Sequence, residues 1–203
     1  MHDETNMTHS ERMAAGLWYD ANYDPTLLGR QATAKDLVNL YNATPYADED
    51  ERAMLLRKLL GEVGEGTRVL SPVMVDYGSN VRIGPGSYLN HGAYLMDCAP
   101  ITIGDNVFVG PNFGAYTAQH PLLAKERNTG LERALPITIE DDCWLGADVA
   151  VMPGVTIGRG CVIGARSLVT KSMPAGYLCM GSPCRPVRPI TDADTIGEVG
   201  AEN

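Results

Sequence analysis

The chain of 203 residues contains no apolar run close to the 18 to 20 residues that a membrane-spanning helix needs. Its first residues are polar, so we expect neither a transmembrane segment nor a signal peptide, and we interpret the protein as cytoplasmic. A net charge of −9 disfavours nucleic acid and anionic membranes as partners, because both would repel the protein. The length predicts one main core with a small appendage.

Cysteine and histidine are too few to predict a disulfide framework or a metal centre. The five cysteines are an odd number, and none forms the close pair that is typical of zinc sites. Two of the four histidines lie near the N-terminus, which leaves His91 and His120 as candidate ligands that would need a third partner. A metal site on these two residues is an alternative, but we expect no metal.

A six-residue repeat is the dominant pattern that is present. Strands have a side-chain period of two and helices one of 3.6, so a strict period of six with frequent glycine fits neither a long helix nor an ordinary meander. It is typical of a parallel β-helix, in which three hexapeptides form one triangular coil. The apolar anchors are Ile83, Leu89, Leu95, Ile103, Val109 and Ala115, then Ile139, Leu145, Val151, Ile157, Ile163 and Val169.

The anchors, and the small or β-branched residues two positions before each of them, should point into the coil. The count slips by two residues at Ala99-Pro100 and is broken between Ala115 and Ile137, which indicates one repeat domain with an inserted loop. We therefore predict a mainly β protein with a β-helix over residues 63–190 and a protruding loop at 116–136. A glycine-rich β-sandwich is the alternative.

Helix signals precede the repeats, over residues 1–62. The pair Thr8 and Glu11 forms a capping-box pattern, a second start is predicted at Thr33, and a third helix should begin after Asp48. This helical leader would cap the open end of the solenoid. The acidic residues 191–203 are expected to form a partly disordered tail.

Charge is unevenly distributed along the chain. No acidic residue lies between Asp148 and Asp192, whereas five basic residues do, which indicates a local anion-binding region on an acidic protein. A solvated basic face is the alternative. The five are Arg159, Arg166, Lys171, Arg185 and Arg188.

His120 is the strongest candidate for proton transfer, because imidazole takes and returns a proton near neutral pH and this one lies in the inserted loop. Asn90 follows an anchor and begins a turn, where its amide would either orient a substrate or stabilise the turn. Cys98 lies where the count slips; it would be a nucleophile only with an adjacent base and a lowered thiol pKa.

Taken together, these segments resemble the maltose and galactoside O-acetyltransferases among the hexapeptide-repeat acyltransferases. The resemblance covers nearly the whole chain, including the leader, and the leader combined with the His120 loop is its most specific part. The segments that carry it are residues 11–13, 19–20, 77–80, 103–106, 117–121, 136–139, 144–146, 153–158, 169–171 and 181–185.

The resemblance implies a left-handed parallel β-helix and a homotrimer with active sites between neighbouring subunits. It also implies acetyl-coenzyme A as the acetyl donor, with no metal required. His120 would be the general base in a direct transfer to an acceptor hydroxyl, and Asn90 would stabilise the oxyanion of the tetrahedral intermediate. Donor contacts would come from Ala147, Ala165, Thr170, Lys171, Arg185 and Arg188, and acceptor contacts from Asp20, Tyr88 and Asp97.

The acceptor remains open at this level. The segment from Asp24 to Leu28 lacks an arginine that galactoside-type members have nearby, and the Ala99-Pro100 corner is more similar to the maltose type. A sugar hydroxyl is the first hypothesis, and an amine or a xenobiotic such as an antibiotic is the second. A non-catalytic trimeric scaffold and a metal-dependent β-helix protein are alternatives of a different class.

Overall fold

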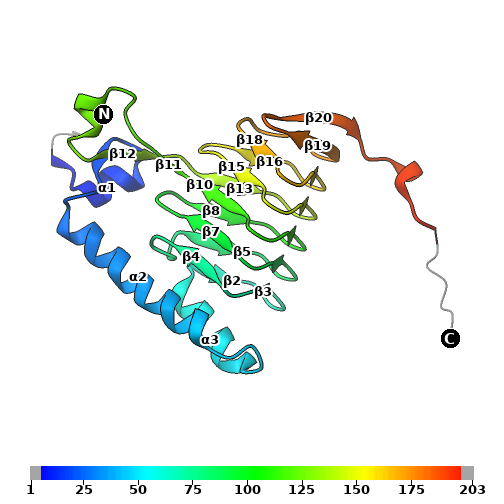
Figure 1. Cartoon of the computed structure of the whole chain (residues 1–203), viewed down its shortest axis with the longest axis horizontal. Helices are drawn as coiled ribbons and strands as arrows, with labels where there is room; N and C mark the ends of the chain where they lie inside the picture. The colour runs from blue at the N-terminus through cyan, green and yellow to red at the C-terminus, as the bar shows by residue number, and fades with distance from the viewer. Residues whose placement is uncertain (1–5, 198–203) are drawn as a thin grey trace.

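The computed structural model describes residues 6–197 and shows a parallel β-helix that follows a helical N-terminal segment (Figure 1). The expected partial disorder of the tail falls in part on residues 198–203, which lie outside the described range. The helices are α1 (His9–Ala14), α2 (Pro25–Ala43), α3 (Glu49–Leu59) and α4 (Ala124–Arg127), with a 3-10 helix at Asp192–Asp194. None of the helices between residues 6 and 197 has the length and apolarity that a membrane crossing requires.

Three sheets form the faces of the β-helix. The first face contains β2 (Glu62–Val63), β5 (Val81–Ile83), β8 (Ile101–Ile103), β13 (Ile137–Ile139) and β16 (Thr156–Ile157). The second face contains β3 (Arg68–Val69), β6 (Tyr88–Leu89), β9 (Phe108–Val109), β14 (Trp144–Leu145), β17 (Val162–Ile163), β19 (Tyr177–Gly181) and β20 (Cys184–Pro189). The third face contains β4 (Val73–Val75), β7 (Ala93–Met96), β10 (Gly114–Tyr116), β15 (Ala150–Val151) and β18 (Leu168–Val169).

The repeat anchors form the core, as the hexapeptide pattern predicts. Strands on each face pair in parallel, with anchor opposite anchor, for example Ile83 with Ile103 and Leu145 with Ile163. The anchors and the residues two positions before them are at most 2% exposed. Among the described strands of these three faces, only β20 is antiparallel to its neighbour, and it closes the second face at the C-terminal end. This parallel stacking excludes the β-sandwich alternative.

One corner of the prism is longer than the other two. Between the third and first faces, Ile83 lies eight positions after Val75 and Ile103 lies eight positions after Leu95, where the regular spacing is six. In the next coil the same corner contains the whole loop 116–136. We call these segments, residues 76–80, 97–100 and 117–136, the inserted corner. The repeat count recognises the second insertion but not the first, because it begins at Ile83, whereas the structure has an earlier coil.

The leader helices follow the sequence signals with one exception. The Thr8 and Glu11 capping box is present at α1, and α3 spans Glu49–Leu59 as expected. The predicted start at Thr33 is wrong, since α2 begins at Pro25. The Asp24 carboxylate accepts a hydrogen bond from the Leu27 N–H at 2.9 Å, and proline is favourable at the first helical position. Helices α2 and α3 lie at the end of the solenoid formed by its first coil (Figure 1).

The loop 116–136 contains regular structure of its own. A small antiparallel sheet has the order β1-β12-β11, where β1 is Tyr19–Asp20, β11 is Ala118–Gln119 and β12 is Leu131–Ala134. Tyr19 pairs with Glu132, so the leader reaches across the chain and holds the loop. The absence of periodicity in the loop therefore does not mean an absence of structure, because its strand partner is more than a hundred residues away.

Candidate active site

A cavity of about 360 Å³ lies at the inserted corner, beside the small sheet. Asp76, Cys98 and Tyr116 line it from three successive coils, and His120 and Glu132 line it from the loop. The leader closes the remaining side. The two-residue insertions and the long loop thus occur on the same corner for a structural reason, since together they form this cavity.

His120 presents a nitrogen that is suited to accept a proton. Its Nδ1 lies 2.9 Å from the Leu131 carbonyl oxygen, which can only accept, so Nδ1 carries the hydrogen of the neutral ring. Nε2 is then left with its lone pair, 3.7 Å from Oε2 of Glu132. The side chain is 43% exposed, so an acceptor can reach it. The hydrogen bond at Nδ1 thus selects the tautomer in which Nε2 can accept a proton.

Glu132 is a residue of this site that the sequence does not reveal. It is 8% exposed, and one of its carboxylate oxygens accepts a hydrogen bond from the buried Tyr19 hydroxyl. Nothing in the repeat pattern distinguishes Glu132 from the other acidic residues. Its position becomes informative only when β12 is seen to pair with β1 and to run beside His120.

Cys98 does not have the environment of a nucleophile. Its thiol donates a hydrogen bond to Oδ2 of Asp76, with the two atoms 3.5 Å apart, and the Tyr94 hydroxyl donates to Oδ1 of Asp76 at 3.0 Å. Burial, followed by the nearby carboxylates of Glu132 and Asp76, raises the pKa of the Cys98 thiol. The thiol therefore stays protonated near neutral pH, which disfavours a covalent acyl-enzyme.

Asp97, which the resemblance places at the acceptor, lies inside the fold, where backbone groups occupy its carboxylate. Asp97 is fully buried, and Oδ1 accepts hydrogen bonds from the backbone N–H groups of Asp76 at 3.0 Å and Tyr77 at 2.8 Å. Oδ2 accepts a third from the Asn80 N–H at 3.2 Å. Burial raises the pKa of this carboxyl, against the effect of these donors. Asp97 holds the inserted corner in shape, and the carboxylates that line the cavity are those of Asp76 and Glu132.

Asp20 lies near the rim but is not among the residues that line the cavity. Its Oδ1 accepts hydrogen bonds from the N–H groups of Asn22 at 3.0 Å and Tyr23 at 2.9 Å, which shapes the turn after β1. The neighbouring Ala21 and Asn22 line the cavity instead.

Asn90, Ala147 and Ala165 lie on a different corner, between the second and third faces. We call this the short corner, formed by residues 90–92, 110–113, 146–149 and 164–167. The Asn90 amide oxygen accepts a hydrogen bond from the His91 N–H at 2.8 Å, and the Ala147 carbonyl accepts one from the Arg166 N–H at 2.8 Å. Strands of the third face begin at the short corner and end at the inserted corner. One copy of the chain therefore does not bring Asn90 and His120 together.

Tyr88 points outward from the second face, in a row of outward-facing residues. The register aligns Tyr88 with Phe108, Trp144, Val162 and Leu178. Phe108 and Trp144 are exposed. This apolar row contrasts with the corresponding row on the first face, where Arg82, Thr102, Thr138 and Thr156 face outward.

In the folded structure, acidic residues neutralise two of the five basic residues of the acid-free stretch. Arg159 forms ion pairs with Asp141 and Asp142 from the preceding coil. Arg188 binds Asp194 through two hydrogen bonds of 2.8 and 2.6 Å, which lower the pKa of Asp194 to about 2. The first pairing cannot be read from the sequence, because stacked coils bring Arg159 beside residues 17 and 18 positions earlier, whereas Arg188 pairs with an acid just beyond the end of the acid-free stretch.

Five of the six predicted donor residues are exposed: Ala165, Thr170, Lys171, Arg185 and Arg188. Thr170 and Lys171 follow β18 in the last complete coil, and Arg185 lies on β20. Within residues 6–197, neither Lys171 nor Arg185 forms an ion pair. Both side chains are therefore available to an anionic ligand.

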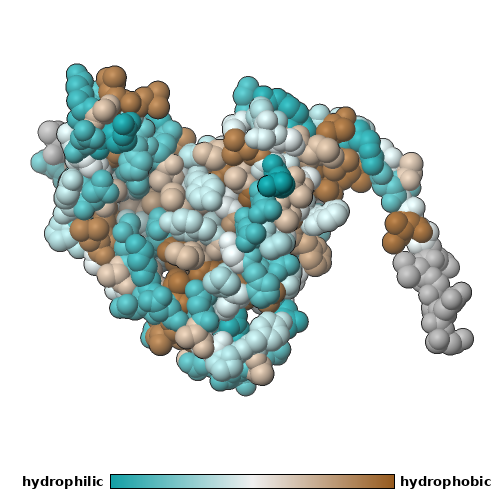
Figure 2. Space-filling view, in the orientation of Figure 1, coloured by the Kyte–Doolittle hydropathy of each residue, from teal (hydrophilic) through white to brown (hydrophobic). Residues whose placement is uncertain are grey.

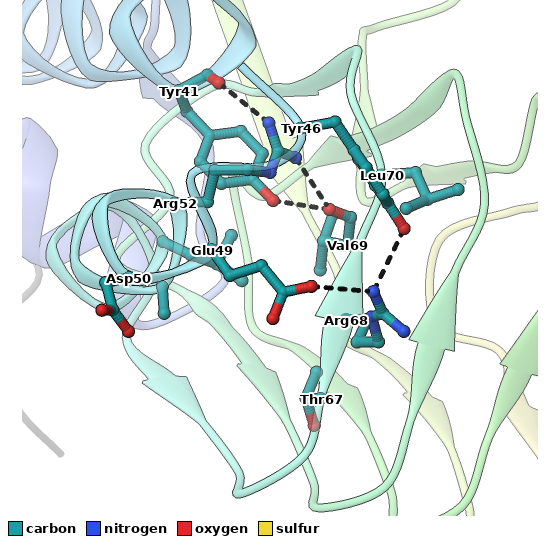
Figure 3. Close-up of a pocket in the computed structure, with 11 residues that line it drawn as sticks. Tyr41, Tyr46, Glu49, Asp50, Arg52, Thr67, Arg68, Val69 and Leu70 are labelled. Atoms are coloured by element: carbon teal, nitrogen blue, oxygen red, sulfur yellow. Dashed lines mark hydrogen bonds and ion pairs between the residues drawn. The ribbon is translucent and has the colours of Figure 1, made fainter. Parts of the chain in front are cut away.

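A second hollow of about 260 Å³ lies between α3 and β3 (Figure 3). Its polar groups satisfy one another. The guanidinium of the buried Arg52 lies 4.4 Å from the centre of the Tyr41 ring and donates to the carbonyls of Thr44 and Val69. Arg68 bridges Tyr46 and Glu49 on the same wall. These contacts join the leader to the first coil, and this hollow contains no group prepared for catalysis.

The described part of the chain contains no cluster of three or more His, Cys, Asp or Glu side chains arranged to hold a metal ion. All five cysteines are free and buried. Cys143 and Cys161 occupy inward positions as small apolar side chains, as the repeat count predicts.

Comparisons with known proteins identify family models and relatives that match this chain. A family model described as the maltose acetyltransferase hexapeptide capping motif matches residues 12–64, and one described as bacterial transferase hexapeptide (six repeats) matches residues 136–171. A putative acetyltransferase of Staphylococcus aureus (strain MRSA252) is 48% identical over 184 residues, which cover 91% of this chain and 92% of that protein.

Two solved structures are similar over nearly their whole length. The maltose O-acetyltransferase from Clostridium difficile 630 shares 39% identity, with a TM-score of 0.89, over 92% of this chain and 99% of that one. A galactoside acetyltransferase in complex with coenzyme A shares 36% identity, with a TM-score of 0.89, over 93% of this chain and 94% of that one.

Proposed function

Because the chain belongs to the hexapeptide-repeat acetyltransferases of the maltose and galactoside O-acetyltransferase family, we propose that it transfers an acetyl group from acetyl-coenzyme A to a sugar hydroxyl. The observation that carries this proposal is the geometry of His120. Its Nδ1 is bonded to the Leu131 carbonyl, and its Nε2 is free at a cavity large enough for a small acceptor.

Direct transfer is the mechanism that this site favours. His120 removes the proton of the acceptor hydroxyl as the acceptor oxygen attacks the thioester carbonyl. The resulting imidazolium then gives the proton to the departing thiolate sulfur when the tetrahedral intermediate collapses. The protonated state of Cys98 supports this mechanism, because the described residues that line the cavity include no serine, threonine or lysine that could act as a nucleophile in its place. Holding both substrates in one site supplies much of the rate gain.

The donor side fits coenzyme A chemically. Lys171 and Arg185 are exposed cations available for its phosphates, and Arg188 becomes available if the Asp194 carboxylate is displaced. The galactoside acetyltransferase structure that resembles this chain contains coenzyme A. Ala147 and Ala165 offer backbone groups on the short corner, and Thr170 offers a hydroxyl.

A homotrimer would complete the site. Asn90 and His120 lie at opposite edges of the third face, so the oxyanion contact proposed for Asn90 requires the Asn90 of a neighbouring copy. Exposed apolar residues at the tip of the loop support such packing: Leu122 is 95% and Leu123 57% exposed, and the projecting loop is visibly apolar at its tip (Figure 2). In one isolated copy these side chains have no core to join.

The charge of the cavity limits the classes of acceptor that can bind. Asp76 and Glu132 line it, and none of the lysines or arginines among the described residues does, so a phosphorylated or carboxylated acceptor would be repelled. Neutral sugars can donate hydroxyl hydrogen bonds to both carboxylates. The same two carboxylates favour an amine as a second candidate acceptor, since an ammonium group would be attracted to them.

Release of the coenzyme A thiol, measured across neutral sugars, galactosides, amino sugars, sugar phosphates and a hydroxylated antibiotic, tests the proposal. We expect saturable release with a neutral or amino sugar and none with a sugar phosphate. His120→Ala should lower kcat at least 100-fold while coenzyme A affinity by titration calorimetry stays within about two-fold of wild type. Turnover of the variant within a few-fold of wild type would remove His120 from the mechanism.

A further inference from the structure

We infer that Glu132 acts through His120, with its buried carboxylate stabilising the positive charge that the imidazole gains while it holds the acceptor's proton. The inference rests on the general-base role proposed above for His120. It begins from one structural fact: two consecutive residues of β12 face the two nitrogens of the same ring. The Leu131 carbonyl is 2.9 Å from Nδ1, and the Glu132 carboxylate is 3.7 Å from Nε2.

The carboxylate is held firmly in this place. Glu132 pairs with Tyr19 across the small sheet, and the Tyr19 hydroxyl donates a hydrogen bond to Oε1. Tyr19 is fully buried, and the Glu132 side chain is only 11% exposed. Oε2 is thereby left as the oxygen that faces the histidine. A charge held by backbone pairing and a buried donor needs little reorganisation during the reaction.

The 3.7 Å between Nε2 of His120 and Oε2 of Glu132 suits an attraction that becomes strong only in the transition state. In the neutral enzyme the lone pair of Nε2 and the carboxylate do not form a hydrogen bond. When the acceptor O–H bond breaks and an N–H bond forms at Nε2, a cation appears beside a fixed anion. The attraction lasts until the proton moves to the thiolate sulfur as the C–S bond breaks. Glu132 therefore stabilises the transition state more than the ground state, which is the condition for faster catalysis.

Within residues 6–197, Glu132 is the carboxylate that lies within ion-pair distance of His120. Asp76 engages the Tyr94 hydroxyl and the Cys98 thiol, and Cys98 is neutral. The other ionisable side chains on β1 and β12 are engaged elsewhere: the Tyr19 hydroxyl donates to Glu132, Asp20 accepts from the N–H groups of Asn22 and Tyr23, and the Arg133 guanidinium lies 5.1 Å from the centre of the Trp18 ring. Glu132 forms an ion pair with His120 once the imidazole ring is protonated.

Glu132→Gln tests the inference, because glutamine has nearly the same shape and can still accept from Tyr19. We expect kcat/KM to fall roughly 10- to 100-fold with unchanged coenzyme A affinity. We also expect the acidic limb of the kcat/KM profile against pH to move to lower pH, since an imidazolium without its anionic neighbour is less stable. Glu126→Gln is the matched control: it removes one negative charge from the same loop, in α4, away from the cavity.

A second variant separates charge from shape. Glu132→Asp keeps the charge with a shorter reach, so its acidic limb should stay close to that of wild type even though kcat/KM falls. Loss of activity in Glu132→Gln with an unmoved acidic limb would indicate a merely structural role and overturn the inference, as would kcat/KM within two-fold of wild type. If wild-type protein released no coenzyme A thiol with any acceptor, the proposed function would fail. If His120→Ala remained active, the general-base role and this inference would both fail, and if only Glu132→Gln remained active, the inference alone would.

Discussion

Asp97→Asn tests whether the buried carboxylate of Asp97 holds the inserted corner or contacts the acceptor. The wild-type carboxylate accepts hydrogen bonds from the N–H groups of Asp76, Tyr77 and Asn80. Asparagine retains one carbonyl oxygen but places an NH₂ group where the other oxygen accepts. At least one buried backbone donor then loses its partner, at a cost of about 1–3 kcal/mol.

Loss of the charge weakens the remaining hydrogen bonds as well, so we expect Asp97→Asn to lower the free energy of unfolding by about 2–3 kcal/mol. For a chain of this length that corresponds to a fall in Tm of about 5–10 °C. The measurement is thermal unfolding at one fixed protein concentration, because assembly would make Tm depend on concentration. Asp36→Asn, on the exposed side of α2, is the control and should change stability by less than about 0.5 kcal/mol.

The refuting result is specific. If Asp97→Asn left Tm within about 2 °C of wild type but raised the KM for the acceptor several-fold, Asp97 would be an acceptor ligand after all. The acceptor contact that the family resemblance implies for Asp97 would then be correct, and the structural role inferred from its burial would be wrong. A fall in Tm with an unchanged acceptor KM at a temperature where the variant is folded would support the structural role.

The remaining predictions concern the donor side and the cysteines. Asp194→Asn should strengthen coenzyme A binding about two- to five-fold by freeing Arg188, whereas Lys171→Ala should weaken it, both measured by calorimetry. Arg188 lowers the pKa of Asp194 to about 2, so the ion pair is fully formed above the pKa of an unfolded carboxyl and is lost only as pH falls towards 2. The effect of Asp194→Asn on coenzyme A binding should therefore be constant between pH 5 and 8. It should disappear at high salt, because salt screens the charges. Burial raises the pKa of the Cys143 thiol to about 11, and all five cysteines are buried, so native protein at pH 8 should resist iodoacetamide, with labelling by mass spectrometry appearing only after denaturation; rapid labelling of native protein would contradict this.

Much of the fold follows from the hexapeptide count. Anchors such as Ile139, Leu145 and Val151 are spaced so that each falls on a different face, and apolar side chains at that spacing can be buried together only if the chain turns three times per coil. The handedness does not follow from the count, since connections between parallel strands are usually right-handed. It is implied by the resemblance to the family.

The start of α2 shows how local signals compete. Thr33 and Asp36 form an acceptable helix start, but Asp24 followed by Pro25 is a stronger one, and the helix runs through Thr33 without interruption. The Thr33 hydroxyl then donates to the Gly29 carbonyl inside the helix. The sequence contains both signals, and the packing of Leu27 and Ala34 on the buried side of one continuous helix decides between them.

The sequence by itself determined the solenoid, its apolar core, the position of the loop, and His120 as the residue most suited to proton transfer. Only the tertiary structure decided that the leader strand pairs with the loop, that Glu132 and Asp76 line the cavity, that Asp97 is fully engaged by backbone N–H groups, and that Asn90 lies on another corner. The physical reason is the range of the interactions. Repeat periodicity is a local property of the chain, whereas the environment of a charged side chain depends on residues from other coils and from the leader, whose positions are known only once the coils have stacked.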